Sequence, residues 1–249
     1  MKKLSIIIPM YNVAQYLEKC IGSVYNQELN EQEFEVILVD DESPDNSLVV
    51  AESLTKNLPN VTIISQKNKG LGGARNTGLC HATGKYILFL DADDWYLPNA
   101  LQHILTLARD NELDILEFAS QGITPQGIVQ YHSSAVSKEI SDGMTYYNSV
   151  RYLHSACNKL YNIDFLKKNN LFFSEHIFIE DFEFNTRTFA LAERVLATDF
   201  LVAQFLQSPN SITRNSDPLK KEKIIKDLIV VLHKTKDSYD TYILNKDTK

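Results

Sequence analysis

The first half of the chain alternates short apolar runs with amphipathic segments. Four runs are rich in β-branched residues and long enough for a strand: Leu4–Ile8, Phe34–Val39, Val61–Ser65 and Lys85–Leu90. Near-continuous apolarity is typical of parallel strands that are covered on both faces. A segment with helical spacing follows each run: Ala14–Tyr25, Asp45–Lys56, Leu71–Ala82 and Pro98–Asp110. This alternation predicts an α/β fold with a doubly wound, mostly parallel sheet.

The second half of the chain has a less regular pattern. A further strand is predicted at Asp114–Ala119, followed by a hairpin or mobile loop over residues 120–143. Helices are predicted at Met144–Leu153, Ile163–Asn169 and Glu180–Leu191, and Asp217-Pro218 has the residues that favour a helix start. We therefore predict an α/β half over residues 1–120, a smaller second half of the same domain over 121–215, and a C-terminal helix with a tail over 216–249.

Composition and charge narrow the class of protein. The chain has 249 residues and a formal net charge of −7, which argues against a nucleic-acid polymer as partner because phosphates require a basic surface. Cys20, Cys80 and Cys157 lie far apart and show no metal-ligand spacing. Reduced thiols in a cytoplasmic protein are the simplest interpretation. No stretch approaches the roughly 18 apolar residues of a membrane span.

Polar clusters follow the predicted strands at their carboxyl ends, where doubly wound sheets bind ligands. Asp40-Asp41-Glu42-Ser43 follows the second strand, and Asp91-Ala92-Asp93-Asp94 follows the fourth. The loop after the third strand leads into the Gly- and Arg-containing segment 68–76. We expect two acidic clusters and one glycine-rich segment to meet at one edge of the sheet.

The segment Asp91-Ala92-Asp93 fits a site for Mn²⁺ or Mg²⁺, which prefer a few carboxylate oxygens together with substrate phosphates. The alternative is that Asp93 or Asp94 caps the next helix. Asp41 fits a hydrogen-bond acceptor for a base or a ribose hydroxyl, with a turn carboxylate as the alternative.

Gly70–Gly78, GLGGARNTG, resembles a dinucleotide-binding loop but fails its spacing, because Arg75 stands where the third glycine is required. We interpret the segment as a flexible start of a helix that presents Arg75, with Asn76 beside it, to a ligand. A solvated Arg75 on a glycine-rich turn is the alternative.

Several motifs together resemble the family 2 glycosyltransferases of the GT-A fold. They run in the same order from Leu4 to Thr188: SIIIPMYN, VDDESPDNS, NKGLGGARNTGL, GKYILFLDADDWYLP, CNKLYN and IEDFEFNTR, with a fainter match at PNSIT. The resemblance implies that residues 1–120 bind a nucleotide-sugar and that 121–215 face the acceptor.

The resemblance also implies roles for particular residues. Nucleotide contacts are implied for Pro9, Tyr11, Asn12, Asp40, Asp41, Arg75 and Asp91. A divalent ion is implied at Asp93 and Asp91, the catalytic base at Asp181, and the acceptor side of the cleft at Glu180 and Lys159.

The function expected from these residues is inverting transfer of a sugar, from a UDP-sugar by preference, to a hydroxyl of a glycan or lipid-linked acceptor in cell-surface polysaccharide synthesis. A catalytically inert sugar-nucleotide-binding protein and a sugar-phosphate nucleotidyltransferase are the alternatives. Lys220, Lys221, Lys223 and Lys226 suggest peripheral contact with the inner face of a membrane.

Overall fold

The computed structural model describes residues 2–133, 135, 137, 139–149, 155–208 and 217–247. In chain order the elements are β1 (Leu4–Met10), α1 (Leu17–Tyr25), β2 (Phe34–Asp40), α2 (Ser47–Thr55), β3 (Val61–Ser65), α3 (Gly70–His81), β4 (Tyr86–Phe89), β5 (Trp95–Tyr96), α4 (Leu101–Asp110), β6 (Ile115–Ile123), β7 (Val129–Ser133), α5 (Gly143–Ser149), β8 (Lys159–Asn162), α6 (Ile163–Lys168), α7 (Glu180–Leu191), β9 (Val195–Leu206) and α8 (Pro218–Asp247).

One mixed sheet runs through both halves of the chain. Its strand order is β3-β2-β1-β4-β8-β6-β9-β5, and β7 pairs with β6. The strands β3, β2, β1 and β4 are parallel, whereas β8 is antiparallel to both of its neighbours, β4 and β6. The carboxyl ends of β1, β2 and β4 therefore meet at one edge, and β8 enters the sheet there from the opposite direction.

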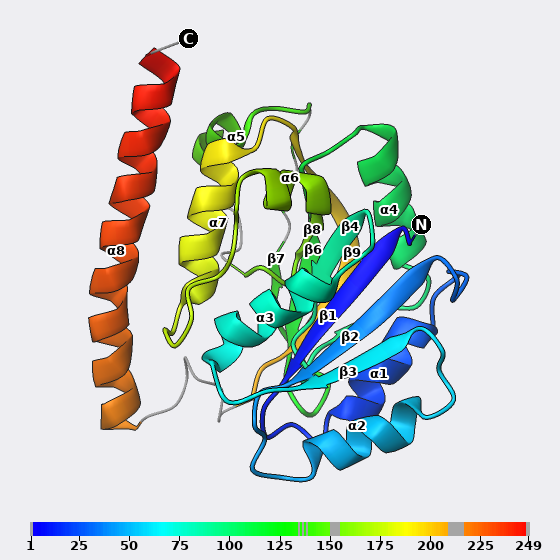
Figure 1. The fold of residues 1–249 in the computed structure, drawn as a ribbon. Coiled ribbons are helices and arrows are strands. Elements are labelled where there is room, and N and C mark those ends of the chain that lie inside the picture. Colours follow the sequence, from blue (N-terminus) through cyan, green and yellow to red (C-terminus); the bar gives the residue numbers. More distant parts are fainter. Residues whose placement is uncertain are drawn as a thin grey trace.

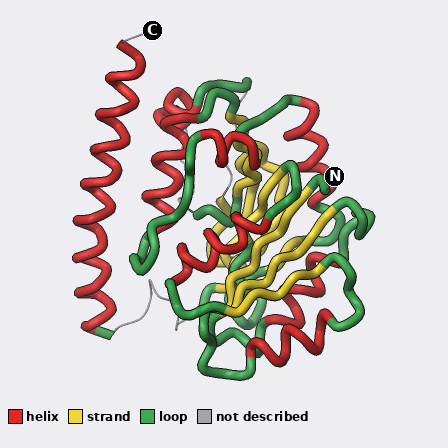
Figure 2. Tube along the Cα trace, in the orientation of Figure 1, coloured by secondary structure: helices red, strands yellow, loops and turns green. Residues whose placement is uncertain are grey.

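Helices cover both faces of the sheet. In Figure 1, α1 and α2 lie on one face, whereas α3, α6 and α7 lie on the other. The same three-layer arrangement is visible in Figure 2, where the yellow strands form the middle layer. The protein thus has the predicted α/β fold, with parallel strands β1 to β4 in the first half of the chain.

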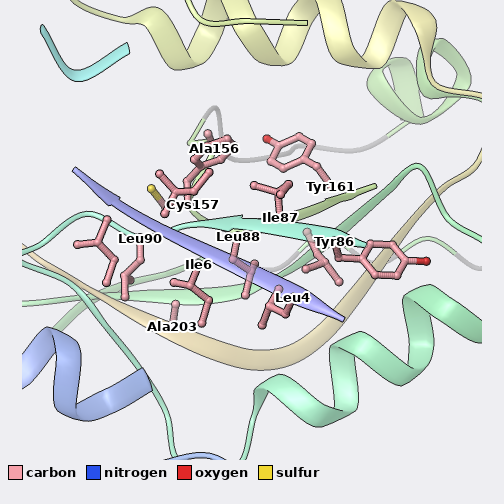
Figure 3. Packing of buried hydrophobic residues seen from close by; sticks show 14 of the residues in the cluster. Leu4, Ile6, Tyr86, Ile87, Leu88, Leu90, Ala156, Cys157, Tyr161 and Ala203 are labelled. Atoms are coloured by element: carbon pink, nitrogen blue, oxygen red, sulfur yellow. The ribbon is translucent and has the colours of Figure 1, made fainter. Parts of the chain in front are cut away.

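The core is built from apolar side chains on both faces of the strands. Leu4, Ile6 and Leu88 lie on one side of the sheet, and Ile87 and Tyr161 lie on the other (Figure 3). All five side chains are buried. Complete burial of an aliphatic side chain contributes about 1.5–3 kcal/mol, so both faces of these strands stabilise the sheet.

The predicted strands and helices of the first half lie within a few residues of the observed ones. In the second half, β8 and the long strand β9 were not predicted, and they join the two halves into one sheet. The helix expected at Met144–Leu153 is seen as α5, and its predicted end lies outside the described residues, as does the PNSIT segment.

The helix α8 stands beside α7 along one side of the molecule (Figure 1). Val231 and Asp227 are buried where α8 faces the rest of the chain. None of the described helices is both long enough and apolar enough to span a membrane.

Candidate active site

Arg75 lies at the centre of a buried cluster of charges. Its guanidinium donates to Asp91 Oδ1 and to Glu180 Oε1, at 2.8 Å each, and also to Asp181 Oδ1. These three carboxylates come from the end of β4 and from the first turn of α7, which are remote in sequence. The Arg75 side chain is only 1% exposed, whereas Asp91 is 33% and Asp181 22% exposed. Asp91 and Asp181 thus reach the solvent, whereas Glu180 and Arg75 lie behind them.

This position corrects the expectation that Arg75 is presented to a ligand. The glycines of α3 are not there for flexibility, because a Cβ on Gly72 would lie 2.4 Å from the carbonyl oxygen of Ser174. A Cβ on Gly78 would lie 2.3 Å from Ile7 of β1. Glycine at these two positions lets α3 pack closely against its neighbours. The close packing brings Arg75 under the carboxylates.

The start of α7 directs two of the carboxylates. Ile179, the residue before the helix, has the left-handed backbone conformation, with φ 59° and ψ 29°. A β-branched residue rarely adopts this conformation, which is strained and often found near functional sites. The turn places Glu180 and Asp181 toward Arg75. The second oxygen of Asp181 accepts a hydrogen bond from the Ala156 amide at 2.9 Å.

The surroundings of Glu180, Asp181 and Asp94 raise the pKa of all three carboxyls. Burial, together with the neighbouring Asp181, raises the pKa of Glu180 to about 7 although Arg75 opposes the shift. Burial also raises the pKa of Asp181, which Arg75 and the Ala156 amide lower in part. The pKa of Asp94 is well above its usual value because of burial and the nearby Asp93 and Asp91. A site that raises the pKa of several carboxylates is suited to proton transfer.

Asp41 forms the second part of the site, at the end of β2. Its Oδ1 accepts hydrogen bonds from the Gln66 side chain at 2.7 Å and from the Lys69 amide at 2.9 Å. Asp41 is 3% exposed, and its neighbour Asp40 has one buried oxygen, Oδ1, without a hydrogen bond in the described structure. The loop between β3 and α3 is therefore fastened to the acidic end of β2, beside the cluster around Arg75.

The residues predicted to contact the nucleotide around β1 occupy the same edge. Pro9 is buried within β1, and Tyr11, just beyond the strand, is 53% exposed. Asn12 has a positive φ of 57°, and its amide faces the Ser43 hydroxyl at 3.4 Å. The Asp41 amide donates to the Met10 carbonyl, so the ends of β1 and β2 are joined.

The acidic turn after β4 fits an open site for a divalent ion. Asp91 uses one oxygen for Arg75 and is 33% exposed, and Asp93 is half-buried on the same turn. The described residues contain no cluster of three or more His, Cys, Asp or Glu side chains arranged around a metal position. Two carboxylates that need further oxygen ligands suit Mn²⁺ or Mg²⁺ bound together with a diphosphate. Asp94 instead accepts from the Leu206 amide at 2.7 Å and fastens β9.

Lys159 does not face a cleft. Its ammonium group is buried and lies 3.6 Å from the carboxylate of Glu117. Lys159 was predicted to lie on the acceptor side of the cleft, but it is buried behind the site. Sequence reasoning did not find Glu117, Ala156 or Ile179. The pairing of β6 with β8, which brings Glu117 opposite Lys159, has no sequence signal of its own.

The fold is of the GT-A type, as in solved structures of glycosyltransferases, and comparison with known proteins agrees. The sequence profile described as Glycosyl transferase family 2 matches residues 5–189. The chain belongs to this family.

Similar proteins include the uncharacterized glycosyltransferase EpsJ of Bacillus subtilis (strain 168), which is 35% identical over 219 residues, covering 84% of this chain and 62% of the relative. The poly(ribitol-phosphate) beta-N-acetylglucosaminyltransferase TarS of Staphylococcus aureus (strain MW2) is 29% identical over 197 residues, covering 78% of this chain and 34% of TarS.

Among solved structures, S. aureus TarS 1–349 in complex with UDP-GlcNAc has a TM-score of 0.79 and 25% sequence identity, covering 93% of this chain and 66% of that one. This chain therefore spans less than two thirds of the length of EpsJ, and a third of full-length TarS.

Proposed function

We propose that the protein transfers a sugar from a nucleotide diphosphate to an acceptor hydroxyl with inversion at the anomeric carbon. The observation that carries this proposal is the convergence of Asp91, Glu180 and Asp181 on the buried Arg75. This convergence supports a base at Asp181 close to a metal-binding turn at Asp91, at the edge of the sheet where such folds bind ligands.

UDP-sugars are the proposed donors. Two observations support them: the family to which the chain belongs, and the similarity to TarS, whose structure was solved with UDP-GlcNAc. We propose that the nucleotide is lined by residues at the ends of β1 and β2: Pro9, Tyr11, Asn12, Asp40 and Asp41. TarS is named a poly(ribitol-phosphate) beta-N-acetylglucosaminyltransferase, which supports a polymer that bears hydroxyl groups as the proposed acceptor.

Asp181 is the proposed base. It takes the proton of the acceptor hydroxyl while that oxygen forms a bond to the anomeric carbon and the bond to the diphosphate breaks. Arg75 and the Ala156 amide hold one oxygen of Asp181 each, so the orientation of the carboxylate is fixed. Asp93, with Asp91, would hold Mn²⁺ or Mg²⁺, which offsets the charge of the departing diphosphate.

Two alternatives predict different behaviour. A nucleotidyltransferase needs a glycine-rich basic loop after its first strand, whereas this chain has PMYNVAQY there. An inert binding protein would bind UDP without turnover. A panel of nucleotide-sugars with Mn²⁺, read out as release of the nucleotide diphosphate, separates these cases. Transfer from a UDP-sugar supports the proposal, and UDP binding without turnover of any donor contradicts it.

Replacement of Asp93 is expected to weaken metal-dependent binding. Asp93→Asn removes one anionic ligand, so we expect the gain in UDP affinity on adding Mn²⁺ to fall by at least about tenfold. Calorimetric titration with UDP, with and without Mn²⁺, measures this gain. The matched control is Asp164→Asn, which removes an exposed carboxylate paired with Lys85 and should keep the full gain. An undiminished gain in Asp93→Asn would exclude Asp93 as a ligand.

We further propose that α8 contacts a membrane surface. Four aliphatic residues on one side of α8 are exposed: Ile225 (63%), Leu228 (40%), Ile229 (54%) and Leu232 (54%). The exposed Lys221 lies next to this side. Lys223 instead donates to Asp227 and to the His176 carbonyl, so only part of the predicted lysine set faces outward. An apolar stripe with an exposed lysine beside it suits an anionic bilayer.

Replacing the four aliphatic residues by Ser is expected to reduce co-sedimentation with vesicles of anionic lipid several-fold, because the helix loses its apolar contact. The paired control is Val49→Ser/Ile128→Ser, which removes two exposed aliphatic side chains elsewhere. Equal sedimentation of the two variants would contradict a membrane role for α8. A change in oligomeric state without any effect on vesicle binding would assign the stripe to a protein contact.

A further inference from the structure

The peptide group between Ser155 and Ala156 is held from both sides. Its carbonyl oxygen, on Ser155, accepts a hydrogen bond from Lys159 Nζ at 2.8 Å. Its amide, on Ala156, donates to Asp181 Oδ2 at 2.9 Å. Because a trans peptide group is planar, its carbonyl and its N–H point in opposite directions. Lys159 and the proposed base therefore lie on opposite sides of one rigid group.

We infer that Lys159 is a positioning residue that acts on Asp181 through this peptide group. The inference rests on the proposed function, because it assigns Lys159 to the same reaction. An ammonium group that binds the carbonyl polarises the peptide and strengthens the hydrogen bond that its N–H donates, since hydrogen bonds in a chain reinforce each other. Lys159 thus holds the second oxygen of Asp181 in place and favours the anionic form that accepts a proton.

The surroundings of Lys159 show why a lysine is needed there. The residue is buried, and its ammonium group also donates to the Asn158 side chain at 2.8 Å. The carboxylate of Glu117, the ion-pair partner of Lys159, lies 3.6 Å away and also accepts from the Tyr146 hydroxyl at 2.9 Å and from Asn158. Two of the ammonium donors are thus directed at the 155–158 segment. An apolar side chain would fill the same volume without the cost of burying a charge, but it would not bind the carbonyl.

Several elements act on Asp181 at the same time. Arg75 of α3, the Ala156 amide and Lys159 of β8 favour its anionic form, whereas burial and Asp91 at the end of β4 oppose it. Glu180, the preceding residue of α7, shares Arg75 with it. Ala156 and Cys157 lie on the side of the sheet that faces the helix α7, as Figure 3 shows. Arg75 is bonded directly to Asp181, whereas Lys159 reaches Asp181 through the peptide group between Ser155 and Ala156.

The test uses two variants. Lys159→Met alone leaves Glu117 buried without its cation, so the main variant is Glu117→Gln/Lys159→Met, which removes both charges. The assay is release of UDP from UDP-GlcNAc with Mn²⁺ present and water as the acceptor. We expect the double variant to have a kcat about 10- to 100-fold lower than the unmodified protein at an unchanged KM. The matched control, Glu117→Gln, keeps the bond from Lys159 to the Ser155 carbonyl and should retain kcat. A normal kcat in the folded double variant would overturn the inference.

A spectroscopic readout follows the peptide group itself. With ¹⁵N-labelled alanine, the Ala156 amide proton is expected to move upfield in the double variant and to stay in place in Glu117→Gln. If the double variant does not fold, the test uses the unmodified protein. The NMR scalar coupling across the hydrogen bond, between Lys159 Nζ and the Ser155 carbonyl carbon, is then measured. Absence of that coupling overturns the inference.

Asp181→Asn, assayed alongside, separates this inference from the proposed function. Normal turnover in Asp181→Asn means that the proposed base is wrong. Loss of turnover in Asp181→Asn together with a normal double variant means that only the role of Lys159 is wrong.

Discussion

Asp181→Asn is expected to lose sugar transfer while the protein remains folded and still binds UDP. An amide cannot accept the proton of the acceptor hydroxyl, and loss of a general base typically lowers kcat by about 10²- to 10⁴-fold. Donor binding should persist because Asp41 and the acidic turn at Asp91 lie on other elements. The measurements are kcat for release of UDP from the active donor and the affinity for UDP with Mn²⁺.

Asparagine keeps most of the local structure. Its oxygen accepts from Arg75, but its amide nitrogen then meets the Ala156 N–H, so one hydrogen bond of Asp181 is lost. We therefore expect a loss of stability of about 1–3 kcal/mol, the usual cost of one unsatisfied partner. Asp164→Asn, which changes an exposed carboxylate, is the control for both measurements. Transfer at an unchanged rate in Asp181→Asn would show that another group is the base.

The edge of the sheet that carries the site could be predicted from the sequence. Strand-like runs before Asp40 and Asp91 place both acidic clusters at the carboxyl ends of parallel strands, because alternation of strands and helices leaves few other topologies. Asp181 could not be placed in this way. A carboxylate in the first turn of a helix is ordinary, so only the family resemblance predicted a role for Asp181. Its position in the structure is set by the strained turn at Ile179, which has no sequence signal.

The position of Arg75 was not predictable for a different reason. Burial of an arginine depends on which carboxylates surround it, and those of Arg75 come from residues 16 and up to 106 positions away. The same holds for Lys159, whose partner Glu117 is set by the antiparallel register of β6 and β8. Short strands such as β8 carry a weak pattern, since four residues do not show a period.

Arg75→Met is expected to cause the largest loss of stability of any single replacement in the site. Methionine has a similar length but no charge, so Asp91, Glu180 and Asp181 lose their common cation. Breaking a buried ion pair by removing one partner costs about 3–5 kcal/mol, because the remaining charge is left in a poorly solvated place. Urea unfolding of the unmodified protein and the variant at pH 8 measures the difference in the free energy of unfolding.

The loss should depend on pH in a defined direction. The pKa of Glu180 is already about 7 in the folded protein, above its usual value of 4.5, because of burial and the charge of Asp181. A carboxyl whose pKa is raised by folding takes up a proton on folding. Its contribution to the free energy of unfolding therefore falls as the pH rises from the usual pKa to the pKa in the folded protein. Arg75 lowers the pKa of Glu180 and of Asp181. Its removal therefore raises both pKa values further in the folded protein.

The destabilisation by Arg75→Met is therefore expected to be smaller at pH 5, where Glu180 is largely protonated, than at pH 8, where Glu180 is largely an anion. Lys85→Met is the matched control, because Lys85 pairs with Asp164 at the surface, where the two side chains are 41% and 72% exposed. Such a pair contributes at most about 1 kcal/mol. An equal loss for Arg75→Met at pH 5 and pH 8 would mean that Arg75 does not stabilise the fold by holding Glu180 as an anion.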